Sequence, residues 1–180
     1  MKRSLSMANL LAGVLLVSPL FVLPMRAQQT SVSMSALAKQ QYNGLKRNIL
    51  AAAEKMPEGA YAFQPTKEER SFGAWVAHVA DAQMGICSGI AGTPKSLDAA
   101  SKTSKADLEA ALEQSFEACD AVYDGLTDAN AADPVNFRRA QQPRVITLFS
   151  NIAHDQECYG SMAVYMRLKG VVPPSSEPKS

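Results

Sequence analysis

Apolar residues recur at alternating intervals of four and three along several long segments, and this spacing constrains the fold of the chain more than any other feature. In one segment the intervals run 4-4-3-4-3, through Leu108, Leu112, Phe116, Cys119, Tyr123 and Leu126. Side chains at these intervals lie along one face of an α-helix. The segment is therefore predicted to be a helix that buries this face.

The same spacing predicts four helices in all, at residues 34–56, 71–90, 104–126 and 143–169. Ser71 and Ser104 suit N-cap positions, and Asp107 follows Ser104 at the interval of a capping box. The connecting segments have turn residues and no period, so loops are expected there, including a long one at residues 127–143. The chain is predicted to be all-α, a four-helix bundle over residues 34–171 with a disordered tail at residues 172–180.

The composition fits one globular domain without an electrostatic footprint. With 180 residues, of which 47% are apolar and 19% charged, the chain has enough material for one core. The formal charge is +1, and the Lys and Arg residues are scattered rather than gathered in a run. These features argue against a nucleic-acid-binding surface.

The first 27 residues have the pattern of a secretory signal peptide. The basic start MKRS precedes the apolar run LLAGVLLVSPLFVLP, which is short for a membrane span and is interrupted by Pro19 and Pro24. Cleavage after Ala27 is predicted, with an uncleaved membrane anchor as the alternative. The mature chain is then expected to be periplasmic or secreted, with no stable membrane span.

The segment NIAHDQECYG, residues 151–160, places His154 and Cys158 four apart on one face of the last helix. At 100° per residue, four other polar side chains fall within about 60° of His154 on the helix surface. They are Thr147, Asn151, Ser161 and Tyr165. Buried polar groups need partners, and a metal, a ligand or cross-helix hydrogen bonds would supply them.

The one other histidine, His78, lies near an apolar face of the second helix. Zinc accepts imidazole nitrogen and thiolate sulfur, and three protein ligands with an open fourth position are typical of a catalytic site. His78, His154 and Cys158 are therefore candidate metal ligands, with ordinary buried residues as the alternative. Asp81 and Glu157 lie next to these faces and would orient an imidazole or accept a proton, unless they are solvated surface carboxylates.

The three cysteines are an odd number for an exported protein, in which thiols are normally paired, buried or bound to metal. A disulfide between Cys87 and Cys119 would join the second and third helices and leave Cys158 alone. Three buried free cysteines are the alternative. Cys87 is half a turn out of phase with His78 and is excluded from the same site, whereas Cys119 stays open as a third ligand.

Two stretches, AAAEKMPEGAYAFQPTKEERSFGAWVAHVADAQ and IAHDQECYGSMAVYMRLKGVVPPSS, resemble the DinB superfamily in its exported bacterial branch. The resemblance covers about residues 34–176. Members are four-helix bundles, often dimeric, with a divalent metal held by three histidines, one on the second helix and two at HxxxH spacing on the fourth. His78 and His154 match two of these positions, Cys158 stands at the third, and Ser161 stands where the family commonly has Gln.

With cysteine at position 158, the metal site that the resemblance implies is either retained with a different metal preference or lost. A thiolate would shift the metal preference from nickel or manganese toward zinc or copper(I), whereas the shorter reach of cysteine would end metal binding. The expected cofactor is a divalent transition metal, with zinc favoured and nickel or manganese as alternatives.

The resemblance implies two functions of different classes. One is a metal-dependent transferase or hydrolase that acts on an unknown small molecule, since relatives include thiol-dependent S-transferases and isomerases. The other is a non-catalytic helical-bundle binding protein whose metal site has degenerated. A homodimer is expected from the habit of the family.

Overall fold

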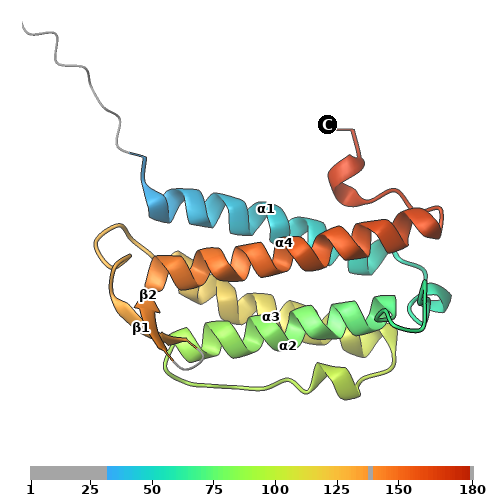
Figure 1. Ribbon diagram of the computed structural model, residues 1–180, viewed down its shortest axis with the longest axis horizontal. Coiled ribbons are helices and arrows are strands. Elements are labelled where there is room, and N and C mark those ends of the chain that lie inside the picture. Colours follow the sequence, from blue (N-terminus) through green and yellow to red (C-terminus); the bar gives the residue numbers. More distant parts are fainter. Residues whose placement is uncertain (1–31, 138–139, 179–180) are drawn as a thin grey trace, which may run out of the picture. The chain divides into compact units, whose positions relative to one another are not determined.

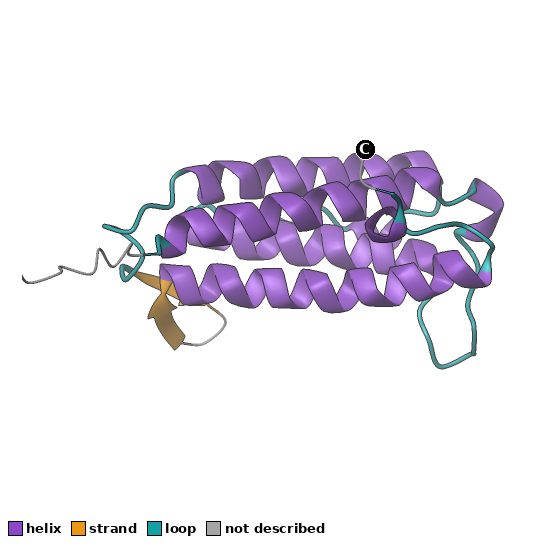
Figure 2. Cartoon of the chain, turned by 90° about the horizontal axis from the view of Figure 1, so that it is seen from above, coloured by secondary structure: helices purple, strands orange, loops and turns teal. Residues whose placement is uncertain are grey.

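The computed structural model describes residues 32–137 and 140–178 of the chain. Its four long helices are α1 (Met34–Lys55), α2 (Phe72–Ile90), α3 (Lys105–Asp124) and α4 (Arg144–Leu168). α1 packs mainly against α4, α2 packs mainly against α3, and the helices run along a common direction (Figures 1 and 2). The predicted four-helix bundle is confirmed, while the predicted signal peptide at residues 1–27 lies outside the described residues. Among the described helices, none is long and apolar enough to span a bilayer.

Serine side chains begin three of the helices. The Oγ atoms of Ser33, Ser71 and Ser104 each accept a hydrogen bond from the backbone N–H three residues further on. These bonds satisfy N–H groups that have no partner within the helix, so serine is favoured at this position. The caps predicted at Ser71 and Ser104 are confirmed. Gly170 follows α4 with a φ of 73°, a left-handed conformation that glycine adopts without steric cost.

A two-stranded antiparallel hairpin stands where the sequence predicts only a long loop. β1 (Pro134–Phe137) pairs with β2 (Ala140–Pro143), and Val135 lies opposite Gln142. The hairpin contacts α2 and α4 at the end of the bundle where α4 begins (Figure 1). Each strand has only four residues, and only Val135 among the described strand residues is buried, so the strands are too short for an alternation of apolar and polar residues to be recognised in the sequence.

The C-terminal segment also differs from its prediction. Instead of disorder from residue 172, Pro174–Ser176 form a short 3-10 helix, η3, that contacts α1. The backbone N–H of Ser175 donates to the hydroxyl of Tyr159 at 2.9 Å, and Glu177 forms an ion pair with Lys55. These two tethers hold the segment against α4 and α1.

Apolar side chains from the four helices fill the interior of the bundle. Tyr42 of α1 stacks on Tyr123 of α3, with ring centroids 3.9 Å apart. Cys87 and Cys119 are both fully buried and form a disulfide that joins α2 to α3. Of the alternatives for the cysteines, the structure has the disulfide, and Cys158 is the free thiol.

Candidate metal centre

Three side chains of the types that bind metals, His78, His154 and Cys158, meet between α2 and α4. The Nε2 atoms of His154 and His78 are 3.1 Å apart, and Sγ of Cys158 is 3.7 Å from Nε2 of His154. One ligand atom from each of the three residues lies within 4.8 Å of the others. In the part of the chain that the structure describes, no other group of three or more His, Cys, Asp or Glu side chains is as suited to an ion. The structure thus brings together the three ligands that the sequence predicts.

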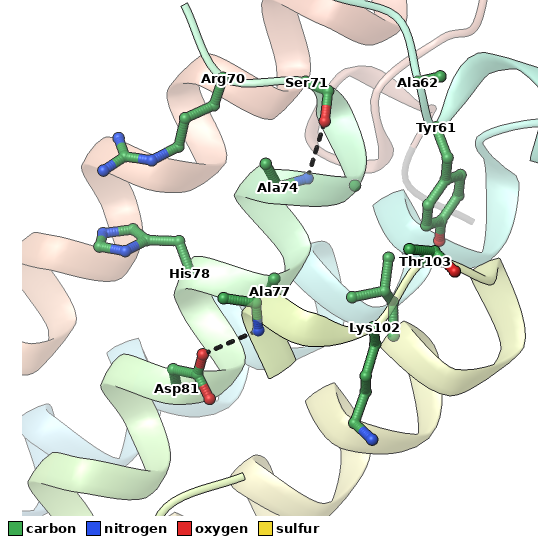
Figure 3. Close-up of a pocket in the computed structure, with 13 residues that line it drawn as sticks. Tyr61, Ala62, Arg70, Ser71, Ala74, Ala77, His78, Asp81, Lys102 and Thr103 are labelled. Atoms are coloured by element: carbon green, nitrogen blue, oxygen red, sulfur yellow. Dashed lines mark hydrogen bonds between the residues drawn. The ribbon is translucent and has the colours of Figure 1, made fainter. Parts of the chain in front are cut away.

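The geometry of the helices explains this meeting. His154 and Cys158 are one turn apart on α4 and share a face. His78 extends from α2 toward the orange ribbon of α4, away from Tyr61 and Lys102 (Figure 3). The thiol of Cys158 is 2% exposed, whereas both imidazoles are half-buried. The site therefore has a closed inner side at the thiol and an open outer side at the imidazoles.

Two of the three distances between the donor atoms are close to those of a tetrahedral zinc site, and the third is no more than 4.8 Å. Ordinary Zn–N and Zn–S bond lengths put two nitrogen ligands about 3.3 Å apart, and a nitrogen and a sulfur ligand about 3.5 Å apart. The corresponding distances in the structure are 3.1 Å and 3.7 Å. Cysteine at position 158 therefore has enough reach to share an ion with His154.

A buried carboxylate that the sequence analysis did not single out lies behind His154. Asp155 is 1% exposed, and its Oδ2 atom accepts a hydrogen bond of 2.7 Å from Nε2 of the fully buried Gln83. Its Oδ1 atom is 3.5 Å from Nδ1 of His154, and neither of these two buried atoms has a hydrogen-bond partner among the described residues. A signal for burial was present, because Asp155 follows Ile152 by three and precedes Tyr159 by four.

Gln83 continues this chain of hydrogen bonds into the bundle. Its Oε1 atom accepts a bond of 2.7 Å from Nδ2 of Asn151, which also lies 3.3 Å from the hydroxyl of Tyr123. Sγ of Cys119 is 3.0 Å from the same Oε1, and because a disulfide sulfur has no proton, this is a packing contact. Asn151 is one of the polar residues on the same face of the helix as His154, and its hydrogen-bond partners therefore come from other helices.

The two imidazoles differ in their affinity for protons. The pKa of His78 is lowered, first because burial disfavours its charged form and next because the Arg70 guanidinium lies nearby. The pKa of His154 is raised, first by the Asp155 carboxylate and next by Cys158. Burial raises the pKa of Asp155. At neutral pH His78 is therefore neutral, whereas His154 is protonated and would have to give up a proton to bind a metal.

The two carboxylates named from the sequence have other surroundings. Asp81 accepts hydrogen bonds from the backbone N–H groups of Ala99 and Ala100, which belong to the short helix η2 (Ala99–Ser101). It fastens the segment before α3 onto α2. Glu157 is exposed on α4. Both residues lie in the described part of the chain, and neither forms a hydrogen bond to an imidazole.

Two cavities open beside the site. The larger, of about 740 Å³, is bounded by α2, α4 and the hairpin, and both His78 and His154 line it. Gly85 and Gly89 form part of its α2 wall, and apart from the neighbouring residues and backbone of α2 itself, no atom of the described residues lies within 4 Å of where a Cβ would stand at either position. The smaller, of about 500 Å³, lies beside the start of α2 and is lined by His78 alone of the three ligands (Figure 3). The larger cavity therefore gives access to both imidazoles.

Both the sequence and the fold are similar to those of known proteins. The model of the DinB superfamily matches residues 41–157. A DinB-like protein from Bacillus cereus is 19% identical with a TM-score of 0.66, over 76% of this chain and 93% of that one. A DinB-like protein from Bacillus subtilis is 16% identical with a TM-score of 0.62, over 79% of this chain and 99% of that one. No curated protein matches the sequence.

Proposed function

Because the chain belongs to the DinB superfamily, we propose that it is a metal-dependent enzyme that transfers or hydrolyses a group of a small molecule. The proposed ligands are His78, His154 and Cys158. The observation that supports this function best is the meeting of their three donor atoms within 4.8 Å of one another, beside a cavity that both imidazoles line.

Zinc is the favoured ion because of the chemistry of the donors. Two imidazole nitrogens and one thiolate sulfur suit zinc, and three protein ligands leave a fourth position for substrate. Of the other ions that the family resemblance implies, manganese is harder and prefers oxygen ligands, and nickel prefers square-planar or tetragonal sites. The metal is therefore expected to be zinc when all three are supplied equally.

The residues around the ligands shape the access to the site. When bound, the ion would act as a Lewis acid and lower the pKa of a thiol or a water molecule in the reaction. Cys158 closes the inner side, so a substrate would enter from the cavity of about 740 Å³. Ile86 and Pro94 give this cavity apolar surface, and Asn136 and Gln142 give it amide groups. A cavity of this size and mixed lining suits a small organic molecule.

A second candidate function is a helical-bundle binding protein without a metal. The observation that favours it is the direct contact of 3.1 Å between Nε2 of His78 and Nε2 of His154. If one ring donates and the other accepts, this contact satisfies both nitrogens without an ion. The same cavity would then bind a small molecule without catalysing a reaction.

Elemental analysis of the purified mature chain, expressed with metals supplied, separates the two functions. A metal enzyme should contain about one equivalent of a transition metal, and the variant His78→Gln should contain almost none. Glu157→Gln is a matched control, since this exposed carboxylate is one residue from Cys158 and should leave the metal content unchanged. A wild-type content below about a tenth of an equivalent would exclude the enzyme and leave the binding protein.

Export and dimerisation are part of the proposal. The basic and apolar pattern of residues 1–27 supports export, and the family resemblance supports a homodimer. The N-terminal residue of the chain recovered from a periplasmic extract tests the first, and light scattering after size-exclusion chromatography tests the second. An intact N-terminus or a monomer would contradict the respective statement.

A further inference from the structure

The chain of hydrogen bonds behind His154 begins at the hydroxyl group of Tyr123, whose single proton is already donated to a backbone carbonyl. The backbone carbonyl of Leu148 accepts the hydroxyl proton of Tyr123 at 2.9 Å. The Tyr123 oxygen can therefore only accept from Asn151, which lies 3.3 Å away. This requirement places the NH2 group of Asn151, and not its carbonyl oxygen, at the Tyr123 side.

The orientation of the Asn151 amide fixes the orientation of the Gln83 amide, and Gln83 in turn donates to Asp155. The second proton of the Asn151 NH2 group goes to Oε1 of Gln83 at 2.7 Å, so the NH2 group of Gln83 must face the other way. It donates to Oδ2 of Asp155 at 2.7 Å. Asp155 thus meets His154 as a hydrogen-bond acceptor, with Oδ1 directed at the ring.

We propose that Asp155 is a positioning residue that keeps a proton on Nδ1 of His154 and so leaves Nε2 free for the metal. The inference rests on the proposed metal binding, since only a ligand nitrogen must be free of its proton. Nε2 is the ring nitrogen that faces His78 and Cys158, at 3.1 Å and 3.7 Å. Nδ1 faces Oδ1 of Asp155 at 3.5 Å.

Burial makes Asp155 the natural partner of this nitrogen. Nδ1 of His154 and Oδ1 of Asp155 are both buried, and neither has another hydrogen-bond partner among the described residues. A shift of about half an ångström would bring the pair to the length of an ordinary N–H···O hydrogen bond. The fully buried Gln83 holds the carboxylate from behind, so this shift requires the imidazole to move and not the carboxylate.

The substitution Asp155→Asn tests the proposal because asparagine keeps the shape of aspartate and changes one side from acceptor to donor. Gln83 still donates, so the amide oxygen must take the place of Oδ2 and the NH2 group must face His154. The proton of the neutral imidazole then moves to Nε2. The affinity for zinc is expected to fall about 10- to 100-fold.

A second substitution, at Gln83, should restore the order of donors and acceptors in this series of hydrogen bonds. In Gln83→Glu/Asp155→Asn, the carboxylate introduced at position 83 accepts from Asn151 with one oxygen and from the new NH2 group with the other. The amide oxygen at position 155 then faces Nδ1 of His154, as the carboxylate does in the natural chain. The network keeps the same net charge, and zinc affinity is expected to return toward the wild-type value.

The proposal is tested by the zinc affinity of each variant and by the position of the proton on His154. Zinc affinity is measured by competition with a chelator, and circular dichroism confirms that each variant folds. Nitrogen-15 spectra of the metal-free protein show which ring nitrogen carries the proton when His154 is neutral. The chain has only two histidines, and the variant His78→Gln assigns their signals.

The expected result is a proton on Nδ1 of His154 in the wild type and in the double variant, and on Nε2 in Asp155→Asn. A proton on Nε2 in the wild type would overturn the proposal, as would an unchanged zinc affinity of Asp155→Asn or a folded double variant that stays as weak. If neither the wild type nor any variant binds zinc, the proposed function fails. The role of Asp155 is then tested only by whether the His154 proton lies on Nδ1 or on Nε2.

Discussion

Cys158 stands where the family resemblance implies a third histidine, and its surroundings suit a metal ligand. Its thiol is 2% exposed and lies 3.7 Å from Nε2 of His154. A thiolate is a softer and more strongly charged ligand than an imidazole, so it favours zinc over nickel and manganese. Position 158 is therefore expected to control both the affinity for a metal and the choice of metal.

Replacing Cys158 should separate these two effects. Cys158→Ser removes the thiolate, and we expect zinc affinity to fall by at least about tenfold, since even partners of ligands contribute this much. Cys158→His should retain a metal and shift its preference toward nickel. Chelator competition with zinc and nickel measures both effects, with Glu157→Gln as the control. Stoichiometric metal in Cys158→His alone would show that the natural cysteine closes the site.

The protonation of His154 should make both stability and metal binding depend on pH. Asp155 and Cys158 raise the pKa of His154 to about 10, from its ordinary 6.5, so the folded chain keeps a proton that the unfolded chain loses. In the metal-free protein, the contribution of this group to the free energy of unfolding is therefore fully present below about pH 6.5 and is lost as the pH rises toward about 10. Denaturant unfolding of the metal-free protein across this interval measures the loss.

Zinc affinity should change in the opposite direction, because the metal displaces a proton from His154. The affinity is expected to rise with pH by roughly tenfold per pH unit for each displaced proton. Chelator competition at several pH values gives the slope. A zinc affinity that does not change with pH would contradict this account of the ligands.

At the scale of the helices, α2 carries one cysteine of the disulfide and one of the candidate metal ligands. Cys87 points to α3, where it forms the disulfide with Cys119, and His78 points to α4. Residues nine apart on a helix are half a turn out of phase, so one helix presents them on opposite sides. Gln83 lies between the two features, in contact with Cys119 and bonded to Asp155. The disulfide therefore holds the helix that carries the first metal ligand.

Loss of the disulfide should weaken the fold more than the site. In Cys87→Ala/Cys119→Ala, the free energy of unfolding is expected to fall by about 2–4 kcal/mol, since a cross-link mainly restricts the unfolded chain. Denaturant unfolding measures this loss. Thiol titration of the denatured natural chain should find one free thiol, and titration of Cys158→Ala should find none. Three free thiols in the natural chain would contradict the disulfide.

For the molecule as a whole, the proposed metal would tie together helices that pack mainly on different partners. α2 packs chiefly against α3, and α4 packs chiefly against α1. His78 belongs to one pair, and His154 and Cys158 belong to the other. An ion that binds all three holds the pairs together and binds only the folded chain. Metal binding should therefore raise global stability.

Thermal unfolding measures this coupling. At a free zinc concentration 100 times the dissociation constant, the free energy of unfolding should rise by about 2.7 kcal/mol. For a domain of this size, the melting temperature is expected to rise by roughly 5–10 °C. His78→Gln should melt at the same temperature with and without zinc. A wild-type melting temperature that zinc does not change would exclude a ligand set shared by the two helix pairs.

The sequence by itself determined the helices, their starts and the three candidate ligands. The intervals of four and three that end at Leu126, and the caps at Ser71 and Ser104, are signals that act within a few residues. His154 and Cys158 are also one turn apart on one helix, so their shared face follows from helix geometry alone. Only His78 required an inference between helices, which rested on its being the one other histidine and which the family resemblance supported.

The tertiary structure alone decided what depends on contacts between distant residues. Gln83 and Asp155 are 72 residues apart, and which partner the buried carboxylate finds depends on how α4 packs against α2. The strands β1 and β2 and the helix η3 are likewise held by contacts to α2, α4 and α1, and they are too short to show a period of their own. Packing fixes such contacts, and packing is a property of the whole bundle, so local patterns could not reveal them.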